Sequence, residues 1–318
     1  MSAGRSKRRF LRLLIAALLA WWAVLLFAHP WFAITRPSGG NVLVVEGWMH
    51  HQGIEEAALT FQRGGYDRIL TTGTARPFAY YLRQGDTAAV RFAAPVSGTV
   101  EMSLAGLPRA WVRMHTDRQQ TAAAIGVGSS RHRIELRNDT LLLLIAGMDT
   151  SEPQEAPVAF ISGLRLNGVN VHMLRHETRI RHADGTESPG TPSFAHQGRE
   201  RLVESGIPGA RITAVPTWHV ERSRTYSCAR DLTAFADSAG IGAYDVATLA
   251  VHARRTWRMH RIARGHRPGA GVIALDDRWC RRWSWWANYY GWFQMLKELA
   301  ALPAPWLVDQ AASNGSLD

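Results

Sequence analysis

The hydrophobic positions of the chain begin with a long continuous run. Residues 13–28 are apolar and uncharged, and the run extends past His29 and Pro30 to about residue 34. A helix rises 1.5 Å per residue, so about 20 residues cross the hydrocarbon core of a bilayer. Basic residues precede the run, which keeps the N-terminus in the cytoplasm and exports the rest of the chain. We expect a transmembrane anchor within residues 1–36, with a cleaved signal peptide as the alternative.

Short buried runs then alternate with amphipathic stretches, which predicts an α/β domain. Residues 41–46 and 67–72 have the pattern of strands, and residues 54–63 between them that of a helix. Such a strand–helix–strand unit requires a parallel sheet. Later helices are predicted over 194–205, 225–239 and 253–264, and later strands over 211–215, 244–251 and 271–275. The expected architecture is an open, Rossmann-like, mostly parallel α/β sheet formed by residues 37–85 and 183–303.

The helical period disappears between the two halves of that domain. Residues 86–182 contain seven short alternating segments about ten residues apart, which is typical of an all-β sandwich. The segments are 88–93, 99–104, 110–116, 131–137, 140–146, 158–166 and 169–171. Residues 162–171 read as a hairpin with an Asn-Gly turn at Asn167. A polar linker is expected at 183–193, and residues 304–318 are expected to be a disordered tail.

Composition and charge exclude several classes of protein. The 318 residues are 46% hydrophobic and 20% charged, an ordinary globular balance. The net charge of +11 concentrates in the N-terminal tail and in residues 252–282, unlike the broad basic surface of a duplex-binding protein. Two cysteines exclude a disulfide framework and a zinc-finger array. In an exported body Cys228 and Cys280 would be free to pair, and two isolated buried thiols are an equal alternative.

Polar residues gather where the predicted strands end, the edge at which open α/β sheets bind ligands. Carboxylate, hydroxyl, imidazole, guanidinium and free backbone N–H groups meet there, a set that suits an anionic ligand. Glu46 and His252 are the candidate catalytic residues, as a base or sugar-hydroxyl acceptor and as a proton shuttle. The candidate ligand-binding residues are Gly47, Trp48, Thr72, Gly73, Thr74, Arg224, Thr225, Arg254 and Arg255. The arginines after His252 also fit a solvated helix face.

The motifs of several common enzyme classes are missing from the sequence. There is no G-x-S-x-G elbow, no Walker loop and no G-x-G-x-x-G after the first strand. These absences argue against a lipase-type hydrolase, a P-loop ATPase and a dinucleotide enzyme. His50, His51 and His219 lack the spacing of metal ligands, so we expect neither a metal nor a cofactor.

Several short motifs follow one another in an order that points to a family. They are VVEGWM at 44–49, A-x3-F-x2-G-x-Y-x2-I-x-T-T-G at 57–73, E-x-G-I-P at 204–208, R-T-Y-x2-A at 224–229 and V-H-A-R-R at 251–255. Through them the chain resembles the YdcF/SanA/ElyC-like envelope family over about residues 41–82 and 190–300. The resemblance implies a membrane-tethered Rossmann-like domain for cell envelope biogenesis. It implies a pocket around Glu46, Gly73, Arg224, Thr225, His252 and Arg254.

One departure from that family concerns the ligand. Ser223-Arg224-Thr225 stands where much of the family has Ser-x-Asn-Thr, and an arginine in place of the asparagine favours a more acidic ligand.

The insert and the C-terminal segment each allow two interpretations. The last hairpin of the insert resembles those of carbohydrate-binding β-sandwiches, so Trp111 either stacks on a sugar or belongs to the core. Asp117, Asp139 and Asp149 are candidate calcium ligands in such a module. Residues 279–306 are rich in tryptophan and tyrosine, which favour membrane interfaces but also pack terminal helices onto sheets.

The anchor and the resemblance together predict a single-pass protein of the bacterial inner membrane, with a cytoplasmic N-terminus and a periplasmic body. The expected ligand is an anionic glycan or polyprenyl-phosphate intermediate, and any chemistry is phosphoester hydrolysis or transfer. The expected partners are the membrane lipid bilayer and envelope assembly proteins, with no nucleic acid. The alternative is a non-catalytic glycan-binding scaffold for polysaccharide or peptidoglycan assembly. Export argues against a third class, a binder of a cofactor such as S-adenosylmethionine.

Overall fold

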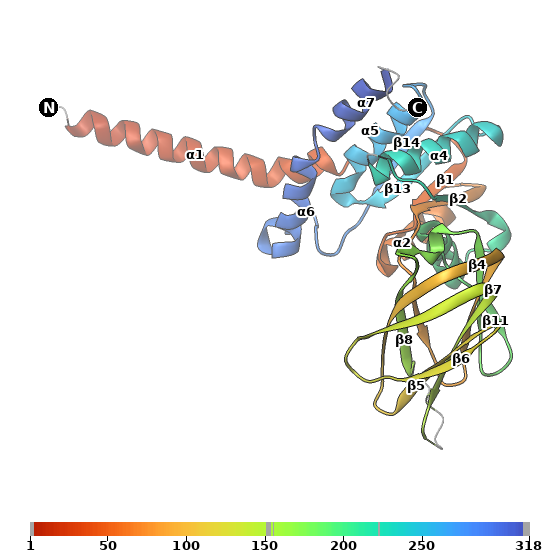
Figure 1. Ribbon diagram of the computed structural model, residues 1–318. Coiled ribbons are helices and arrows are strands. Elements are labelled where there is room, and N and C mark those ends of the chain that lie inside the picture. Colours follow the sequence, from red (N-terminus) through yellow and green to blue (C-terminus); the bar gives the residue numbers. More distant parts are fainter. Residues whose placement is uncertain (1–2, 151–153, 155, 222, 314–318) are drawn as a thin grey trace. The chain divides into compact units, whose positions relative to one another are not determined.

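The computed structural model of the chain describes residues 3–150, 154, 156–221 and 223–313. The chain divides into two compact units, one formed by Met1–Thr74 and Ala195–Asp318 and the other by Ala75–Phe194 (Figure 1). The second unit therefore interrupts the first within the chain. It is wider than the expected insert of residues 86–182, because strand β3 (Ala79–Leu82) pairs with strand β8 (Ala159–Leu166) of the insert. Part of the expected linker is strand β11 (Glu187–Pro189), which pairs with strand β10 (His176–Arg181).

The N-terminal apolar run lies in one long helix, α1 (Ala3–Phe32). Its segment Phe10–Phe32 has a mean hydropathy of 2.3, and only 6% of its most apolar stretch is buried. The chain thus has one N-terminal helix long and apolar enough to cross a membrane, a property that a signal sequence shares.

The first unit is built on a five-stranded parallel sheet, as the sequence predicts. Its strands lie in the order β12-β2-β1-β13-β14, which in order of appearance is 3-2-1-4-5, the arrangement of doubly wound sheets. Every residue of the central strand β1 is buried, since such a strand is covered on both faces. The strands are β1 (Val42–Glu46), β2 (Arg68–Thr74), β12 (Ile212–Thr217), β13 (Tyr244–Leu249) and β14 (Ala270–Leu275).

Helices cover both faces of this sheet. On one face, Leu43 and Val45 pack with residues of α2 (His51–Arg63) and with Leu202 of α3 (Phe194–Glu204). On the other face, Val42 and Val44 pack with residues of α4 (Arg224–Ser238). The alternation follows from the period of two of a strand, which sends neighbouring side chains to opposite faces. Helix α5 (Ala253–Ala263) lies beside α4, where its Met259 and Ile262 contact Tyr226.

The C-terminal segment is ordered further than expected. Beyond helix α6 (Tyr289–Ala300), residues 304–313 of the expected disordered tail instead form helix α7 (Ala304–Ser313). The physical reason is burial, because Val308 packs against Tyr226 and Met259. Residues 314–318 lie outside the described residues.

The second unit contains a nine-stranded antiparallel sheet with a core of its own. The Asn-Gly hairpin is confirmed, since Leu166 pairs with Val169 and the turn residues Asn167 and Gly168 both have positive φ. The remaining strands of this unit are β4 (Thr87–Gly106), β5 (Ala110–Thr116), β6 (Gln120–Ala124), β7 (Ser130–Met148) and β9 (Val169–Asn170).

Two pairs of predicted short strands are single long strands. Strand β4 joins the expected segments 88–93 and 99–104, and β7 joins 131–137 and 140–146. The pairing of β4 with β7 shifts register between Arg91 and Val96, and a bulge lets a strand bend without ending. The strands form one hydrogen-bonded sheet, so a two-sheet sandwich is not confirmed.

Candidate functional site

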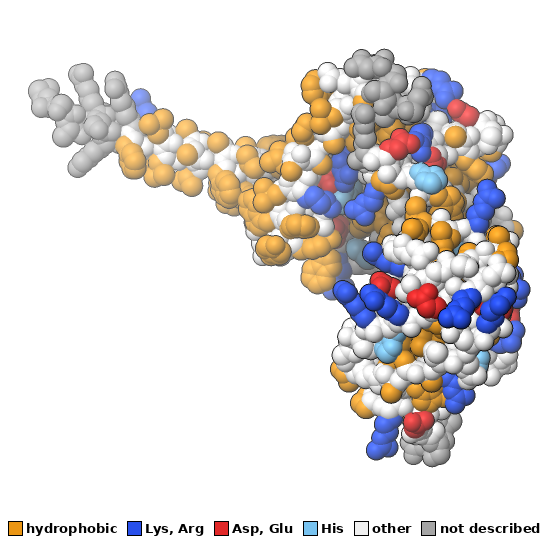
Figure 2. Space-filling view, in the orientation of Figure 1, with side chains coloured by type: hydrophobic (Ala, Val, Ile, Leu, Met, Phe, Trp, Pro, Cys, Tyr) orange, Lys and Arg blue, Asp and Glu red, His pale blue; other side chains and the backbone are white. Residues whose placement is uncertain are grey.

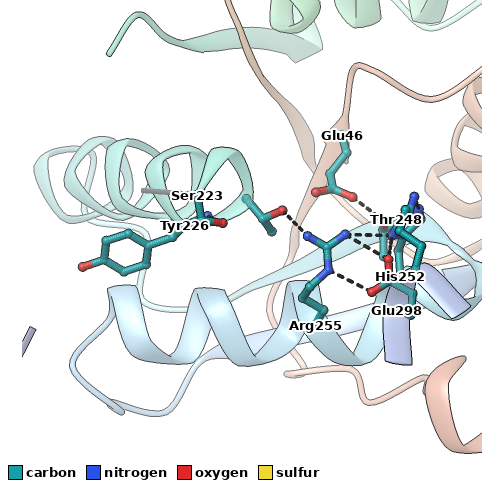
Figure 3. A network of polar contacts seen from close by, with 9 residues as sticks. Glu46, Ser223, Tyr226, Thr248, His252, Arg255 and Glu298 are labelled. Atoms are coloured by element: carbon teal, nitrogen blue, oxygen red, sulfur yellow. Dashed lines mark hydrogen bonds and ion pairs between the residues drawn. The ribbon is translucent and has the colours of Figure 1, made fainter. Parts of the chain in front are cut away.

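The first unit gathers charged groups at the carboxyl ends of its central strands. Strands β1 and β13 are parallel neighbours, so Glu46 at the end of β1 lies next to Thr248 of β13, whose hydroxyl donates a hydrogen bond to the Glu46 carboxylate. Beyond β13, a 3-10 turn (Ala250–His252) brings His252 to the same edge. We call Glu46, Thr248, His252, Arg255, Lys297 and Glu298 the strand-end cluster, and Figure 3 labels all of them except Lys297.

Glu46 is a buried carboxyl group, 4% exposed. Burial raises its pKa, although the Thr248 hydroxyl and the charges of His252 and Arg255 oppose that shift. A carboxyl group with a raised pKa holds its proton at higher pH than usual, so Glu46 is suited to donate a proton.

His252 is oriented by a carboxylate that sequence reasoning missed. Its Nδ1 lies 2.6 Å from Oε1 of Glu298, which is 1% exposed. The opposite ring nitrogen, Nε2, lies 3.1 Å from the Lys297 ammonium nitrogen. With Nδ1–H donated to Glu298, Nε2 carries the lone pair and accepts from Lys297. A carboxylate that fixes the tautomer in this way leaves the lone pair on the other nitrogen, which is the form that accepts a proton.

Arg255 is the second partner of the Glu298 carboxylate. Its Nε lies 2.8 Å from Oε2 and its Nη2 lies 3.0 Å from Oε1, a bidentate pair (Figure 3). Burial alone would raise the pKa of Glu298, but the hydrogen bonds from His252 and Arg255 outweigh it and lower the pKa to about 2. Nη1 of Arg255 donates to the Thr225 hydroxyl at 3.0 Å, which ties α5 to the start of α4.

The Lys297 side chain carries a second cation into the cluster. Burial lowers its pKa, the Glu298 carboxylate opposes this, and the charges of Arg255 and Arg224 lower it further. Arg224 is exposed at the first position of α4, whose N-cap Ser223 accepts from the Tyr226 N–H at 3.5 Å. An exposed and a half-buried cation beside a helix N-terminus favour an anion at this place.

The candidate residues at the ends of β1 and β2 differ in their contacts with the cluster. Trp48 is exposed and its indole meets the His252 ring edge to face, with centroids 5.0 Å apart. Gly47 donates its N–H to the Thr72 carbonyl at 2.8 Å. Strand β2 continues two residues beyond its predicted end, so Gly73 and Thr74 pair with β12 inside the sheet.

The structure does not bring Arg254 to the cluster. Its guanidinium lies over the Trp31 ring, 4.2 Å from the centroid, and its Nε donates to the Trp31 carbonyl. The cause is helical geometry, because neighbouring positions on α5 point about 100° apart. Arg255 therefore faces the cluster while Arg254 faces the end of α1.

Sequence reasoning missed Lys297, Glu298 and Thr248. A signal for the first two is present, since Lys297-Glu298 is the only charged pair in the otherwise uncharged segment 289–301. Their role depends on a contact between α6 and the turn after β13. These two elements are more than forty residues apart in the chain, and no local pattern predicts a contact between them.

The thiol of Cys228 lies beside the hydroxyls of Thr217 and Thr72, close enough to Glu46 to interact with its charge. Burial raises its pKa to about 11, and burial raises that of Cys280 to about 12. Both cysteines are free and buried.

We expect both thiols to be inert in the folded protein. At pH 8 a thiol of pKa 11 is ionised to about one part in a thousand, and only the thiolate is nucleophilic. The folded chain in detergent should show almost no reaction with a chromogenic disulfide reagent, and the unfolded chain should show both thiols. Rapid labelling of the folded chain, or a disulfide recovered from it, would contradict the structure.

The candidate metal ligands are dispersed. His50 caps α2 by accepting from the Gly53 N–H, His51 contacts Glu55 and His219 is exposed. In the described part of the chain, no three His, Cys, Asp or Glu side chains group in a way that could hold a metal ion.

In the second unit, the three candidate aspartates satisfy three separate structural groups. Asp117 accepts from Thr140, Asp139 from the Arg137 N–H, and Asp149 from the Trp111 indole. Trp111 is half-buried, and the Arg113 guanidinium lies 4.4 Å from its ring centroid.

Comparisons with known proteins place the chain in no established family. No protein-family model and no curated protein matches it. Among solved structures, it matches DesR, a beta-glucosidase from Streptomyces venezuelae in complex with D-glucose, at 13% identity and a TM-score of 0.20. The match covers 69% of this chain and 31% of that one, so the chain spans less than a third of the length of DesR. A TM-score this low supports no argument about fold or activity.

Proposed function

We propose that the chain is a single-pass inner-membrane protein of the YdcF/SanA/ElyC-like kind. In this proposal its strand-end cluster binds the phosphate of an anionic glycan or lipid-carrier intermediate in envelope biogenesis. The insert, as a carbohydrate-binding β-sandwich, engages the glycan. The observation that carries the proposal is the pairing of Nδ1 of His252 with the Glu298 carboxylate, while Nε2 faces Lys297.

Cations supply the binding in this proposal. A phosphate takes the Lys297 ammonium from His252 and also contacts Arg224 and the N-terminus of α4. Ammonium and guanidinium groups form charge-assisted hydrogen bonds to phosphate oxygens, and Arg255 stays fixed on Glu298.

In the proposed reaction His252 acts as the base and Glu46 acts as the acid. Nε2 of His252 takes a proton from water as the water oxygen bonds to phosphorus, and the bond from phosphorus to the ester oxygen breaks. Glu46 gives its proton to the departing oxygen, so the products are phosphate and an alcohol. An imidazole nitrogen that accepts a proton and a carboxyl group of raised pKa that donates one form a usual acid–base pair.

Phosphate release by the full chain in detergent tests the catalytic half of the proposal. Farnesyl phosphate serves as a lipid-carrier probe and glucose 1-phosphate as a glycan probe. We expect release from at least one of them, above that of a Glu46→Gln variant. No release from either, with both still bound, would leave a binding protein and remove the phosphoester step.

The orientation of the chain is a separate prediction. An alkaline phosphatase reporter fused after Asp318 should be active in bacterial cells, because that enzyme works only in the periplasm. A β-galactosidase reporter at the same position should be inactive. The reverse result would place the body in the cytoplasm and revive a cytoplasmic cofactor as the ligand.

One observation favours the second candidate function, a non-catalytic glycan-binding scaffold. The insert is a compact unit with its own core, so it has the means to bind a glycan independently of the strand-end cluster. On this account, cluster variants keep their function in cells, and removing residues 86–175 abolishes it.

A further inference from the structure

Helix α6 has an apolar face that the described part of the protein leaves about half exposed or more. Tyr289, Phe293, Leu296 and Leu299 follow one another at helical spacing and are 84%, 49%, 55% and 54% exposed. The opposite face contains Gly291, Gln294, Met295 and Glu298, all buried. Helix α6 is therefore amphipathic, but its apolar face points away from the protein instead of into it.

The segment before α6 runs along the last turns of α1. The Cys280 carbonyl contacts His29 at 2.7 Å, the Trp285 indole donates to the Leu25 carbonyl at 3.2 Å, and Trp292 stacks on Trp21 with centroids 5.9 Å apart. The three positions on α1 are four residues apart and lie on one face of the helix. Residues 280–292 therefore follow α1 back toward its N-terminus.

Helix geometry gives the length of α1 along which residues 280–292 run. From His29 to Trp21 is eight residues, or about 12 Å along the axis at 1.5 Å per residue. The apolar stretch of α1 ends at Phe32, and a hydrocarbon core is about 30 Å thick. If α1 crosses a bilayer, the stacked pair of Trp21 and Trp292 lies well inside the hydrocarbon, and the start of α6 lies there with it.

We infer that residues 283–296 form a re-entrant membrane-embedded element, in which the acyl chains of the bilayer cover the exposed apolar side chains in the first turns of α6. Continuity with α1 identifies the occupant, and Figure 2 shows hydrophobic side chains continuing from α1 onto the adjoining part of the first unit. Exposed Trp283 with the Arg282 guanidinium 4.5 Å from its ring centroid suits the headgroup region.

The polar groups of the turn before α6 are consistent with this environment. Asn288 accepts from the Gly291 N–H at 2.7 Å and donates to the Ser284 carbonyl at 3.3 Å. Backbone at membrane depth must be satisfied within the protein, and this turn satisfies part of its own. The helix then returns to the strand-end cluster, where Lys297 and Glu298 lie on its protein-facing side.

Depth-dependent fluorescence quenching of the full chain in lipid nanodiscs tests this inference. A bimane label is placed on Phe293→Cys and, as the control, on Val203→Cys of α3, which is 38% exposed in the same unit. Nitroxides are carried on the acyl chain of phosphatidylcholine, and iodide is the aqueous quencher. The buried native thiols should contribute little label.

We expect acyl-chain nitroxide to quench the label at 293 at least threefold more than the label at 203, and iodide to do the reverse. Equal iodide quenching at both positions would overturn the inference, and so would a label at 293 that neither iodide nor the acyl-chain nitroxide quenches, since protein would then cover the face. The inference rests on α1 crossing the membrane but not on phosphate as the ligand. A failure here therefore leaves phosphate binding to be judged separately.

Discussion

Replacing His252 with alanine is expected to lower phosphate release by about 100-fold or more while substrate binding changes little. In the proposed reaction Nε2 of His252 takes the proton of the attacking water, and a positioned acid or base contributes about 10²- to 10⁴-fold to a rate. Lys297 and Arg224 remain to hold the phosphate, so the loss should appear in kcat more than in KM. Steady-state release of phosphate from the better of the two probes measures both quantities.

A matched control for this prediction is His266→Ala. His266 is an exposed histidine of the same unit, 2.9 Å from the surface carboxylate of Asp309. Its removal should leave kcat and KM unchanged. If His252→Ala and His266→Ala turn over substrate equally well, His252 is not the proton acceptor and the reaction scheme fails.

Replacing Glu298 with alanine is expected to destabilise the first unit by about 3–5 kcal/mol, because Arg255 and His252 lose the carboxylate that they share. For a unit of this size, 1 kcal/mol corresponds to about 2–4 °C, so Tm should fall by roughly 10 °C. Thermal unfolding of the full chain in detergent measures it. The control is Glu221→Ala, whose exposed pair with Arg230 should be worth under about 1 kcal/mol. Equal shifts for both variants would contradict a structural role for Glu298.

The pH dependence of stability separates the two carboxyl groups of the cluster. Folding lowers the pKa of Glu298 from 4.5 to about 2, so its contribution is complete above pH 4.5 and is lost as the pH falls toward 2. The size of that loss is about 3 kcal/mol. Folding raises the pKa of Glu46, so its contribution is present below pH 4.5 and is lost as the pH rises through the raised value. Glu298→Gln should therefore flatten the decrease of Tm between pH 4.5 and pH 2.

Local sequence patterns predicted the parallel sheet well, because each strand carries its own signal. The run at 41–46 became β1, the run at 244–251 became β13 and its following turn, and the run at 225–239 became α4. The insert was harder to predict. The residues between its predicted segments resemble turns, and only the pairing of β4 with β7 shows that both strands continue through them.

The candidate site was predictable only in part, for a related reason. Glu46, His252 and Arg255 lie at strand ends that the topology brings together, and the sequence indicates both the ends and the residues. Arg254 and Arg255 are neighbours on α5, and their side chains differ only in direction. That direction depends on the residue at which the turn after β13 ends and α5 begins. Glu298 reaches His252 from a distant helix, and such a contact is tertiary.

The central claim is that the strand-end cluster binds phosphate, and thermal stabilisation of the full chain by farnesyl phosphate and glucose 1-phosphate tests it most directly. A ligand at 100 times its Kd stabilises a protein by about 2.7 kcal/mol, which here is roughly 5–10 °C in Tm. We expect such a shift in the wild type, its loss in the double variant Lys297→Met/Arg224→Met, and its retention in Arg267→Met, which removes a surface pair with Asp237. No shift with either probe, or a shift that survives the double variant, would contradict the claim.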